Sequence, residues 1–354
     1  MVIGCLIVIC VTSPIFGSAT LISVIQVFRH GQRTPTKHYP NDPYSDPLNW
    51  PVAPGQLTNV GKEQLYNLGK FTRERYKESL PVAYSPDFIH AETTEFDRTH
   101  MSAQCYLQGL FPPTIKELWN PRIFWSPIPV HPTKVVTTFQ PCAQRSKEHD
   151  KVLNEEPYFK NIDATYASTY EYLSEHAGFN QTTLSDTFFI YDTLFIENEF
   201  GFVAPPWTER IFPEPLETLV EYYLEVDGFN EKLRRLSAGP FLNEVIEHFE
   251  KMEQDPTSAK FFRVYSAHDI TIVEILSALG AFQPHFPYFA STIYFELRKT
   301  SEESYVNIYY KQKDTIQEIT PSGCSKFNCP LKELKRNLGE LLVSVETWKE
   351  ECEE

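Results

Sequence analysis

Residues Leu21–Phe28, LISVIQVF, run directly into residues Arg29–Thr36, RHGQRTPT. The first octet is nearly continuous in apolar and β-branched side chains, which is typical of a central parallel strand covered on both faces. Open α/β sheets bind their ligands just beyond the carboxyl ends of the strands. The order of the two segments therefore predicts an α/β sheet with a ligand site at the end of its first strand.

Strand and helix patterns alternate along much of the remaining chain. Helices are predicted at residues 57–76, 95–110, 241–252 and 268–279. Strands are predicted at residues 87–91, 261–266, 292–297 and 306–310. The last two strands are expected to be antiparallel neighbours. Because alternating strands and helices are typical of α/β proteins, we expect a doubly wound, mixed and mainly parallel sheet flanked by helices.

The stretch between the two sets of alternating segments has a different character. Residues 147–236 are rich in Tyr, Phe and Glu and show helical patterns without clear strand alternation. We interpret this stretch as a smaller helical insertion that forms a cap over one edge of the sheet. The catalytic α/β domain would then consist of residues 20–146 and 237–354.

The chain begins with the features of an export signal. Val2–Val11 is apolar, and Gly17–Ala19 supplies small residues that suit cleavage before Thr20. The apolar run is shorter than the roughly 20 residues that a membrane-spanning helix needs. No Lys or Arg precedes it, and a buried N-terminal strand is the alternative interpretation. We expect residues 1–19 to be a signal peptide and the protein to be secreted rather than lysosomal, without a membrane anchor.

The overall charge narrows the range of partners. The formal net charge is −15, and no stretch of the 354 residues is dense in Lys or Arg. Because a protein that binds nucleic acid needs a basic surface to displace condensed counterions, we expect no nucleic acid partner. An acidic protein can still bind an anionic substrate when positive charge is concentrated locally in a cleft.

The segment after the first strand offers such a concentration. Arg29 and Arg33 flank His30, and Gly31 lets the backbone approach closely. A guanidinium group presents a planar fork of donors that matches phosphate oxygens. A neutral imidazole between such groups is a competent nucleophile toward phosphorus. The alternative is a surface loop with two solvated arginines and an incidental histidine, which the position at a strand end disfavours.

Two further segments deliver polar groups to the same edge of the sheet. His268 and Asp269 follow a predicted strand and begin an apolar helix, and Arg98 lies in the first turn of another predicted helix. Each residue has an ordinary alternative: a helix cap for Asp269, a partly buried ring for His268 and a solvated side chain for Arg98. Because the strand ends face one crevice, we expect these groups to join His30 there.

Together these segments resemble the histidine acid phosphatase family, in particular its animal prostatic and lysosomal branch and the related secreted venom acid phosphatases. The resemblance extends over nearly the whole mature chain. Its most specific elements are the RHGxRxPT block at residues 29–36 and the distant pair His268–Asp269. It also includes residues 55–61, 68–69, 97–99, 101–103, 110–113 and 265–269. The fold that it implies is the one shared by histidine phosphatases and phosphoglycerate mutases.

The resemblance implies a two-step hydrolysis of phosphate monoesters, either small molecules or phosphoproteins. His30 would attack phosphorus and become a phosphohistidine, and Asp269 would protonate the departing alcohol and then assist water. The phosphate oxygens would be bound by Arg29, Arg33, Arg98 and His268. Arginines would supply the positive charge, so no metal or other cofactor is implied, and the ten histidines contain no HExxH-like spacing. An acidic pH optimum would follow, because Asp269 must be protonated when the leaving group departs.

The cysteines agree with an oxidising compartment. Cys324 and Cys329 can close a short loop, and Cys142 with Cys352 would tie the tail to the middle of the chain. The resemblance places two disulfides of the family at these four positions. A third pair that is usual in vertebrate members has no counterpart here, which would leave the cap less tightly held.

Two further residues, Cys105 and Asn180, allow predictions about burial. Cys105 lies four residues after Met101 in a helical pattern, and we expect it to be a buried free thiol. Asn180 begins the only glycosylation sequon, Asn180–Thr182, which predicts that this region lies at the surface.

Several functions compete within and beyond this family. A phytase-like or lipid-phosphate specialist stays open, because the sequence of the insertion does not reveal a substrate. A catalytically silent secreted binding protein is disfavoured, since all six expected site residues are present. A phosphoryl mutase is disfavoured by export, because phosphorylated metabolites are scarce outside the cell. We expect a broad phosphomonoesterase, and the resemblance also allows a homodimer.

Overall fold

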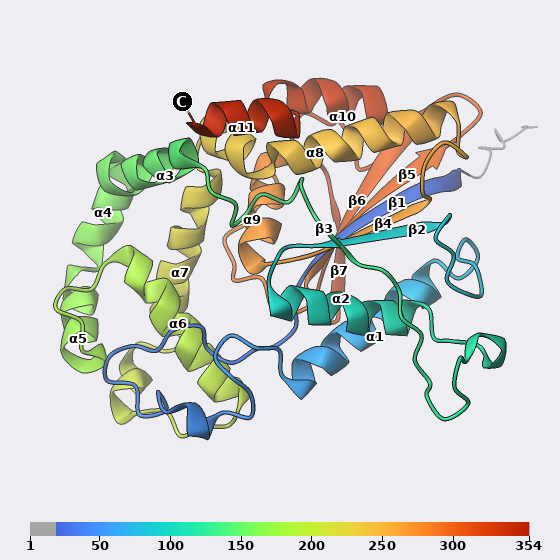
Figure 1. Ribbon diagram of the computed structural model, residues 1–354. Coiled ribbons are helices and arrows are strands. Elements are labelled where there is room, and N and C mark those ends of the chain that lie inside the picture. Colours follow the sequence, from blue (N-terminus) through green and yellow to red (C-terminus); the bar gives the residue numbers. More distant parts are fainter. Residues whose placement is uncertain (1–18, 354) are drawn as a thin grey trace, which may run out of the picture.

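The computed structural model describes residues 19–353 of the chain. The predicted signal peptide, residues 1–19, lies almost entirely outside the described residues. The described chain forms a mixed sheet with helices on both faces and a further group of helices to one side (Figure 1). None of the helices within residues 19–353 has both the length and the apolar character that crossing a bilayer requires.

The sheet confirms the expected mixed, mainly parallel architecture. Its strands are β1 (Thr20–Arg29), β2 (Ile89–Thr93), β3 (His131–Pro132), β4 (Phe262–Ala267), β5 (Thr292–Lys299), β6 (Ser304–Gln312), β7 (Thr315–Ile319) and β8 (Cys329–Pro330). The strand order is β3-β2-β4-β1-β5-β6-β7, and β8 pairs with β6. Neighbours from β3 to β1 are parallel, whereas the pairs from β1 to β7 are antiparallel. β1, β2, β3, β4 and β6 therefore run in one direction, and the expected antiparallel pair β5–β6 is present.

β1 lies in the middle of the sheet and is covered on both faces, as its apolar sequence predicts. Because alternate side chains of a strand point to opposite faces, Val24 and Phe28 pack into one core and Ile25 and Val27 into the other. The core around Val24 and Phe28 lies against α1 (Asn59–Arg75) and α2 (Asp97–Leu110). The opposite face carries α8 (Glu231–Gln254), α9 (Asp269–Ala278), α10 (Leu331–Leu338) and α11 (Val345–Glu353) (Figure 1).

The helices beside the sheet form a unit that we call the cap. Its helices are α3 (Ala143–Glu155), α4 (Pro157–Thr165), α5 (Ala167–Ala177), α6 (Leu184–Glu199) and α7 (Leu216–Glu225). Apolar side chains of α5, α6 and α7 pack with Tyr39 and Trp50 from the loop after β1 and with Val273 of α9. The loop after β1 therefore lies against the cap at one side of the sheet edge. Short 3₁₀ helices occupy Pro47–Asn49, Ile115–Glu117, Pro206–Arg210, Val226–Gly228 and Gly339–Leu341.

Helix α8 is longer than its sequence pattern predicts. Proline lacks a backbone N–H and commonly ends a helical pattern, so the sequence favours a start after Pro240. In the structure the helix begins at Glu231 and Pro240 lies inside it. The side chain of Asn230 caps the helix by accepting the N–H of Leu233 at 2.9 Å. This cap and the burial of many α8 side chains offset the hydrogen bond that Pro240 cannot make.

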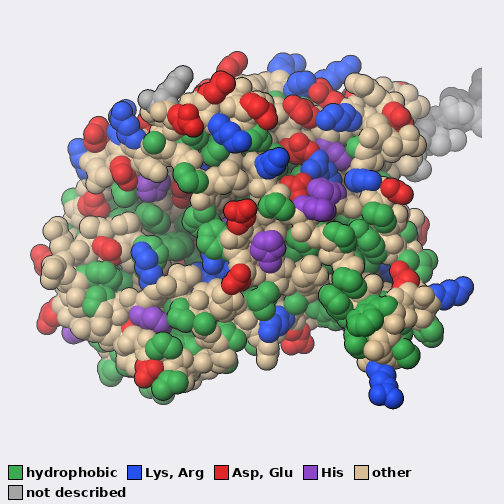
Figure 2. Space-filling model, viewed as in Figure 1, with side chains coloured by type: hydrophobic (Ala, Val, Ile, Leu, Met, Phe, Trp, Pro, Cys, Tyr) green, Lys and Arg blue, Asp and Glu red, His purple; other side chains and the backbone are tan. Residues whose placement is uncertain are grey.

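Large apolar side chains are exposed together in the loop that follows α2. They gather over that part of the surface in Figure 2. The large apolar residues exposed in this loop are Ile115, Trp119, Ile123, Phe124 and Trp125. Contact with another protein molecule would be favourable at this surface, because it would remove these groups from water.

Both predicted disulfides are present. Cys142–Cys352 joins the start of α3 to α11 across a sequence separation of 210, and Cys324–Cys329 closes a loop before β8 with a separation of 5. Cys105 is the free cysteine of the described chain, as expected, although it is half-buried rather than fully buried. Burial raises the pKa of its thiol, which disfavours the reactive thiolate.

The two disulfides should contribute unequally to stability, because a cross-link constrains the unfolded chain more when it closes a longer loop. Replacing both Cys142 and Cys352 with Ser should lower the free energy of unfolding by about 5 kcal/mol, against about 2 kcal/mol for Cys324 and Cys329. Chemical denaturation of both double variants without reductant measures the difference. Equal losses would contradict the loop-length explanation.

Candidate active site

The carboxyl ends of β1 and β4 and the start of α2 bring the predicted site residues to one edge of the sheet. His30 follows β1, and its backbone N–H donates to the carbonyl of Ala267 at the end of β4 at 2.9 Å. His268 and Asp269 come next in the chain, and the rings of His30 and His268 lie 5.5 Å apart. Arg98 lies in the first turn of α2, which follows β2. The structure therefore brings the expected groups together at this edge of the sheet, in a largely buried cluster of side chains that we call the phosphate crevice.

His30 is almost entirely buried and is held in one orientation. Its Nδ1 lies 2.8 Å from the carbonyl oxygen of Gly31. Because a carbonyl oxygen can only accept a hydrogen bond, Nδ1 carries the proton of the neutral ring and Nε2 keeps its unshared electron pair. This is the protonation pattern that a nucleophilic imidazole needs.

Two glycines let the loop after β1 pack against the start of α1. A Cβ atom on Gly31 would lie 2.2 Å from the carbonyl oxygen of Gly61, and one on Gly61 would lie 2.2 Å from the carbonyl oxygen of Gln32. The backbone N–H of Gly31 also donates to the hydroxyl of Ser102 in α2 at 3.2 Å. The close backbone approach expected at Gly31 is thus an approach to α1, and it fixes the loop that follows His30.

Arg29 is fully buried beside Asp269. Its Nη2 lies 2.7 Å from Oδ2 of Asp269, and Nη1 donates to the carbonyl of Pro287. The guanidinium group also lies over the rings of Phe289 and Phe286, at 4.3 Å and 4.9 Å from their centroids. The charge of Arg29 is therefore balanced by one carboxylate and two aromatic faces.

Arg33 is held by a residue that the sequence analysis did not identify. Its Nη1 and Nη2 donate to the two carboxylate oxygens of Asp192 in α6 at 3.0 Å and 3.1 Å. Both side chains are buried. Asp192 interrupts an otherwise apolar run, residues 188–196 (FFIYDTLFI), and this polar residue in an apolar helix is the signal that could have found it.

Arg98 and His268 form the other side of the crevice. Nη2 of Arg98 lies 3.5 Å from Nδ1 of His268, and Nε2 of His268 lies 2.8 Å from the hydroxyl of Thr94. The rings of Phe96 and Phe139 meet the His268 ring edge-on at 5.0 Å and 4.7 Å. Thr94 directly follows β2. Its position after the end of a strand is the feature of the sequence that could have suggested a role in this site.

The charges of the crevice shift the pKa values of its members. Burial, and then Arg29, Arg98 and Arg33, hold the pKa of His30 well below its usual range. Burial and Arg98 lower the pKa of His268 in the same way. Burial followed by Arg33 lowers the pKa of Arg98 to about 10, which leaves it charged at acidic and neutral pH. The free site thus contains neutral histidines among charged arginines.

The same burial and the same arginines act in opposite directions on the pKa of Asp269. Burial is the largest single influence on the pKa of its carboxyl and would raise it, but the surrounding groups, led by Arg29 and then Arg33, together lower this pKa. Its Oδ1 accepts the backbone N–H of Ile270 at 2.9 Å, the contact of a residue in the first turn of a helix. His268 and not Asp269 occupies the cap position of α9, and no side chain caps this helix, so Asp269 combines its contact with Ile270 with the ion pair to Arg29.

The arrangement fits an anion with several oxygens. Three guanidinium groups face two carboxylates, Asp192 and Asp269, which leaves an excess of positive charge. The Nε atoms of Arg29, Arg33 and Arg98 are buried and have no hydrogen-bond partner among the described residues. Because guanidinium groups bind phosphate oxygens through such N–H donors, a phosphate group is the ligand that this crevice suits best.

Comparison with known proteins identifies the family. The model of the histidine phosphatase superfamily, branch 2, matches residues 20–311. The chain belongs to this family. Among its relatives, rat lysosomal acid phosphatase is 32% identical over 96% of this chain and 82% of the relative. Bovine prostatic acid phosphatase is 32% identical over 93% of this chain and 87% of the relative.

Solved structures agree with the fold of this histidine phosphatase. The apo form of a phytase from Hafnia alvei has a TM-score of 0.72 and 17% identity, over 94% of this chain and 98% of that chain. At this identity the similarity concerns the fold alone. The activity follows from the family and from the curated relatives, which are acid phosphatases. The chain is an acid phosphatase, a hydrolase of phosphate monoesters.

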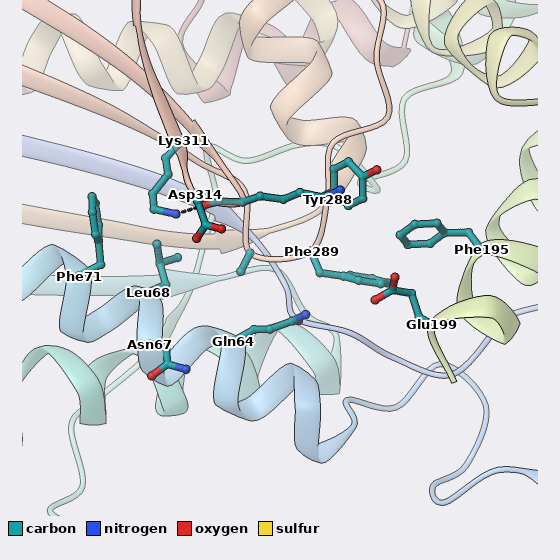
Figure 3. A pocket seen from close by; sticks show the side chains of 12 residues that line it. Gln64, Asn67, Leu68, Phe71, Phe195, Glu199, Tyr288, Phe289, Lys311 and Asp314 are labelled. Atoms are coloured by element: carbon teal, nitrogen blue, oxygen red, sulfur yellow. Dashed lines mark hydrogen bonds between the residues drawn. The ribbon is translucent and has the colours of Figure 1, made fainter. Parts of the chain in front are cut away.

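A hollow of about 470 Å³ adjoins the crevice without containing any of the six predicted site residues. Side chains of α1, α6, the segment before β5 and the β6–β7 turn line it (Figure 3). Phe289 lines this hollow and also lies 6.0 Å from the ring of His30. Phe289 therefore lines the hollow on one side and lies beside His30 on the other. Because none of the six predicted site residues lines the hollow, we treat it as separate from the phosphate crevice.

Replacing Asp192 with Asn tests whether the cap positions Arg33. The variant keeps the shape of the side chain but loses the charge that holds both guanidinium nitrogens, a loss of about 1.5 kcal/mol. The KM for para-nitrophenyl phosphate should rise about tenfold, as that free energy requires. Glu199→Gln, a change at an exposed position of the same helix, is the control and should leave KM unchanged. An unaltered KM in folded Asp192→Asn would show that Arg33 does not depend on Asp192.

Proposed function

We propose that this acid phosphatase is exported and hydrolyses a broad range of phosphate monoesters through a phosphohistidine at His30. One observation carries the proposal. The Nδ1 proton of His30 is engaged by the Gly31 carbonyl, so that Nε2 is left as a buried nucleophile among arginines. Nε2 attacks phosphorus while the bond from phosphorus to the leaving oxygen breaks.

The arginines stabilise charge during this step. Arg29, Arg33 and Arg98 carry the buried N–H donors that would bind the non-bridging oxygens. Such preorganised donors act most strongly in a buried site, because they need no reorganisation as charge develops in the transition state. No step of this mechanism requires a metal or another cofactor.

Asp269 is the proposed general acid and base. In the free site burial acts to raise its pKa, but the surrounding groups, led by Arg29 and then Arg33, together keep this pKa low. A phosphate group bound to the same arginines would oppose their effect and raise the pKa of Asp269. Acidic pH would then favour the protonated carboxyl that donates to the leaving oxygen, and the carboxylate would take a proton from the water that releases phosphate.

His268 is proposed to bind a phosphate oxygen through Nδ1. Burial and Arg98 lower its pKa in the free site, so the ring is neutral there. A bound dianion would favour the protonated ring, with Nδ1 donating to the phosphate and Nε2 donating to Thr94. Acidic pH would support this form as well.

Other features support export. Both disulfides are of the kind that persists in oxidising compartments. Asn180 is exposed, as an acceptor of a glycan must be. The homodimer stays a prediction, and the exposed apolar loop after α2 is the surface that we propose for it.

Hydrolysis of para-nitrophenyl phosphate across pH, with EDTA present, tests the proposed function. The purified protein should be most active at acidic pH and unaffected by EDTA. His30→Ala should lose at least about a thousandfold in kcat, because removal of a covalent nucleophile costs that much or more. Activity that EDTA abolishes, or a folded His30→Ala variant with normal activity, would overturn the mechanism.

The same assay separates the alternatives. A broad phosphomonoesterase should also hydrolyse glycerol phosphate and phosphotyrosine with comparable kcat/KM. Activity confined to phytate or to a phosphorylated lipid would indicate a specialist of the same family. A folded protein without activity on any of these substrates would favour a binding role.

A further inference from the structure

Phe139 is an exposed aromatic side chain that lies against the active site. Its ring meets the ring of His268 edge-on, with the centroids 4.7 Å apart, and lies 5.5 Å from the ring of Phe96. The residue is nevertheless 53% exposed to water. Burial therefore contributes little to holding this ring in place, and the neighbouring residues of the chain must do so.

The turn from Thr137 to Gln140, which carries Phe139, is by contrast firmly held. The backbone N–H of Gln140 donates to the carbonyl of Thr137 at 2.9 Å and closes the turn. Nη1 of Arg145, in the first turn of α3, donates to the carbonyl of Thr137 at 3.1 Å. Nη2 donates to the carbonyls of Thr138 and Gln140 at 3.0 Å and 3.3 Å. One guanidinium group thus binds three carbonyl oxygens of the same turn.

Thr138 joins this turn to α9, the helix that begins at Asp269. Its hydroxyl donates to Oε2 of Glu274 at 2.6 Å and lies 2.6 Å from the hydroxyl of Thr271. Because Thr138 has a single hydroxyl proton and gives it to Glu274, Thr271 must donate to Thr138. Glu274 is 2% exposed, and its Oε1 lies 3.7 Å from Nη1 of Arg145. The helix that starts with the proposed general acid therefore also fixes the turn.

We propose that Phe139 is a positioning residue that orients His268 for phosphate, and that Glu274 holds it there through Thr138. The hydrogen-bond contact between Nε2 of His268 and Thr94 fixes one atom of the ring, about which the ring can still tilt. The edge-on contact with Phe139 removes that freedom. The proposal rests on the proposed function, since it concerns a group that binds phosphate in the same site.

The orientation matters because Nδ1 is the atom of His268 that is proposed to bind phosphate. It lies 3.5 Å from Nη2 of Arg98, so the two groups can bind oxygens of one phosphate. A ring that tilts would separate Nδ1 from this position. Phosphate would then be bound less tightly, although His30 would still be in place to react.

Glu274 can hold Thr138 in either protonation state. Burial raises the pKa of Glu274 to about 7 against the opposing effect of Arg145, and the charge of Asp227 adds to the increase. The carboxyl is therefore largely protonated at acidic pH. Both the carboxylate and the neutral carboxyl offer an acceptor oxygen to the hydroxyl of Thr138. A glutamine side chain offers the same acceptor without a charge.

Thr137 provides a matched control for a role in stability alone. It lies next to Thr138 in the same turn, and its hydroxyl donates to the carbonyl of Ser237 in α8 at 2.9 Å. Thr137 and Thr138 are 1% and 3% exposed. The two hydroxyls therefore differ in the helix to which they attach the turn, and only Thr138 is joined to Glu274.

Phe139→Ala tests the first half of the proposal. At about pH 5 it should raise both the KM for para-nitrophenyl phosphate and the Kd for inorganic phosphate about tenfold, as expected for a misplaced binding group. The kcat should stay nearly unchanged, because His268 binds the phosphate in the substrate and in the transition state alike. Phe139→Tyr keeps the ring and should restore both values. Unaltered phosphate affinity in Phe139→Ala, which folds readily because the side chain is exposed, would overturn the proposal.

A second set of variants tests the part assigned to Glu274. Thr138→Val and Glu274→Leu should raise the same two constants about fivefold, whereas Thr138→Ser and Glu274→Gln, which keep the hydrogen bond, should resemble the parent. Thr137→Val should lower the melting temperature without raising KM. Equal increases of KM in Thr137→Val and Thr138→Val, or no increase in folded Thr138→Val, would overturn this part. Failure of the proposed function would show itself separately, as a parent protein that binds phosphate but hydrolyses no monoester.

Discussion

The structure depends on keeping three guanidinium groups beside a neutral histidine in a buried crevice. Uncompensated burial of such charges is costly, because each is removed from water and repels the others. The surrounding protein offsets this cost in distinct ways. Asp269 pairs with Arg29, Asp192 of the cap pairs with Arg33, and aromatic faces lie beside Arg29 and Arg98. The remaining positive charge is what makes the crevice selective for an anion.

The need to hold three buried guanidinium groups in place also explains why the cap and the sheet must act together. The sheet alone delivers His30, Arg29 and His268 at its carboxyl edge, but it leaves Arg33 on a long loop. A carboxylate on α6 gives this arginine a fixed direction, and the hydroxyl of Thr193 extends the attachment by donating to the backbone carbonyl of Lys37 in the same loop. The cap thus contributes to binding phosphate as well as covering one edge of the sheet.

Much of the sheet and of the active site could be predicted from the sequence, because the site residues directly follow stretches with a clear strand pattern. His30 and His268 directly follow apolar strands, so the α/β topology alone brings them together. Asp192 could not be paired with Arg33 in the same way, since their contact joins segments far apart in the chain and depends on how the cap is oriented. β7 was also missed, because four of its five residues are exposed and it lacks an apolar pattern. The extension of α8 through Pro240 depends on tertiary burial, which local propensity does not report.

The central claim is that phosphate becomes bonded to His30 during turnover. It is tested most directly with Asp269→Asn, in which loss of the general base should slow hydrolysis of the intermediate. The protein is mixed with para-nitrophenyl phosphate, quenched in alkali, where phosphohistidine survives, and analysed by peptide mass spectrometry. One added phosphoryl group is expected on the peptide that contains His30, and on that residue. Turnover without any phosphorylated peptide, or with the phosphoryl group on another residue, would contradict it.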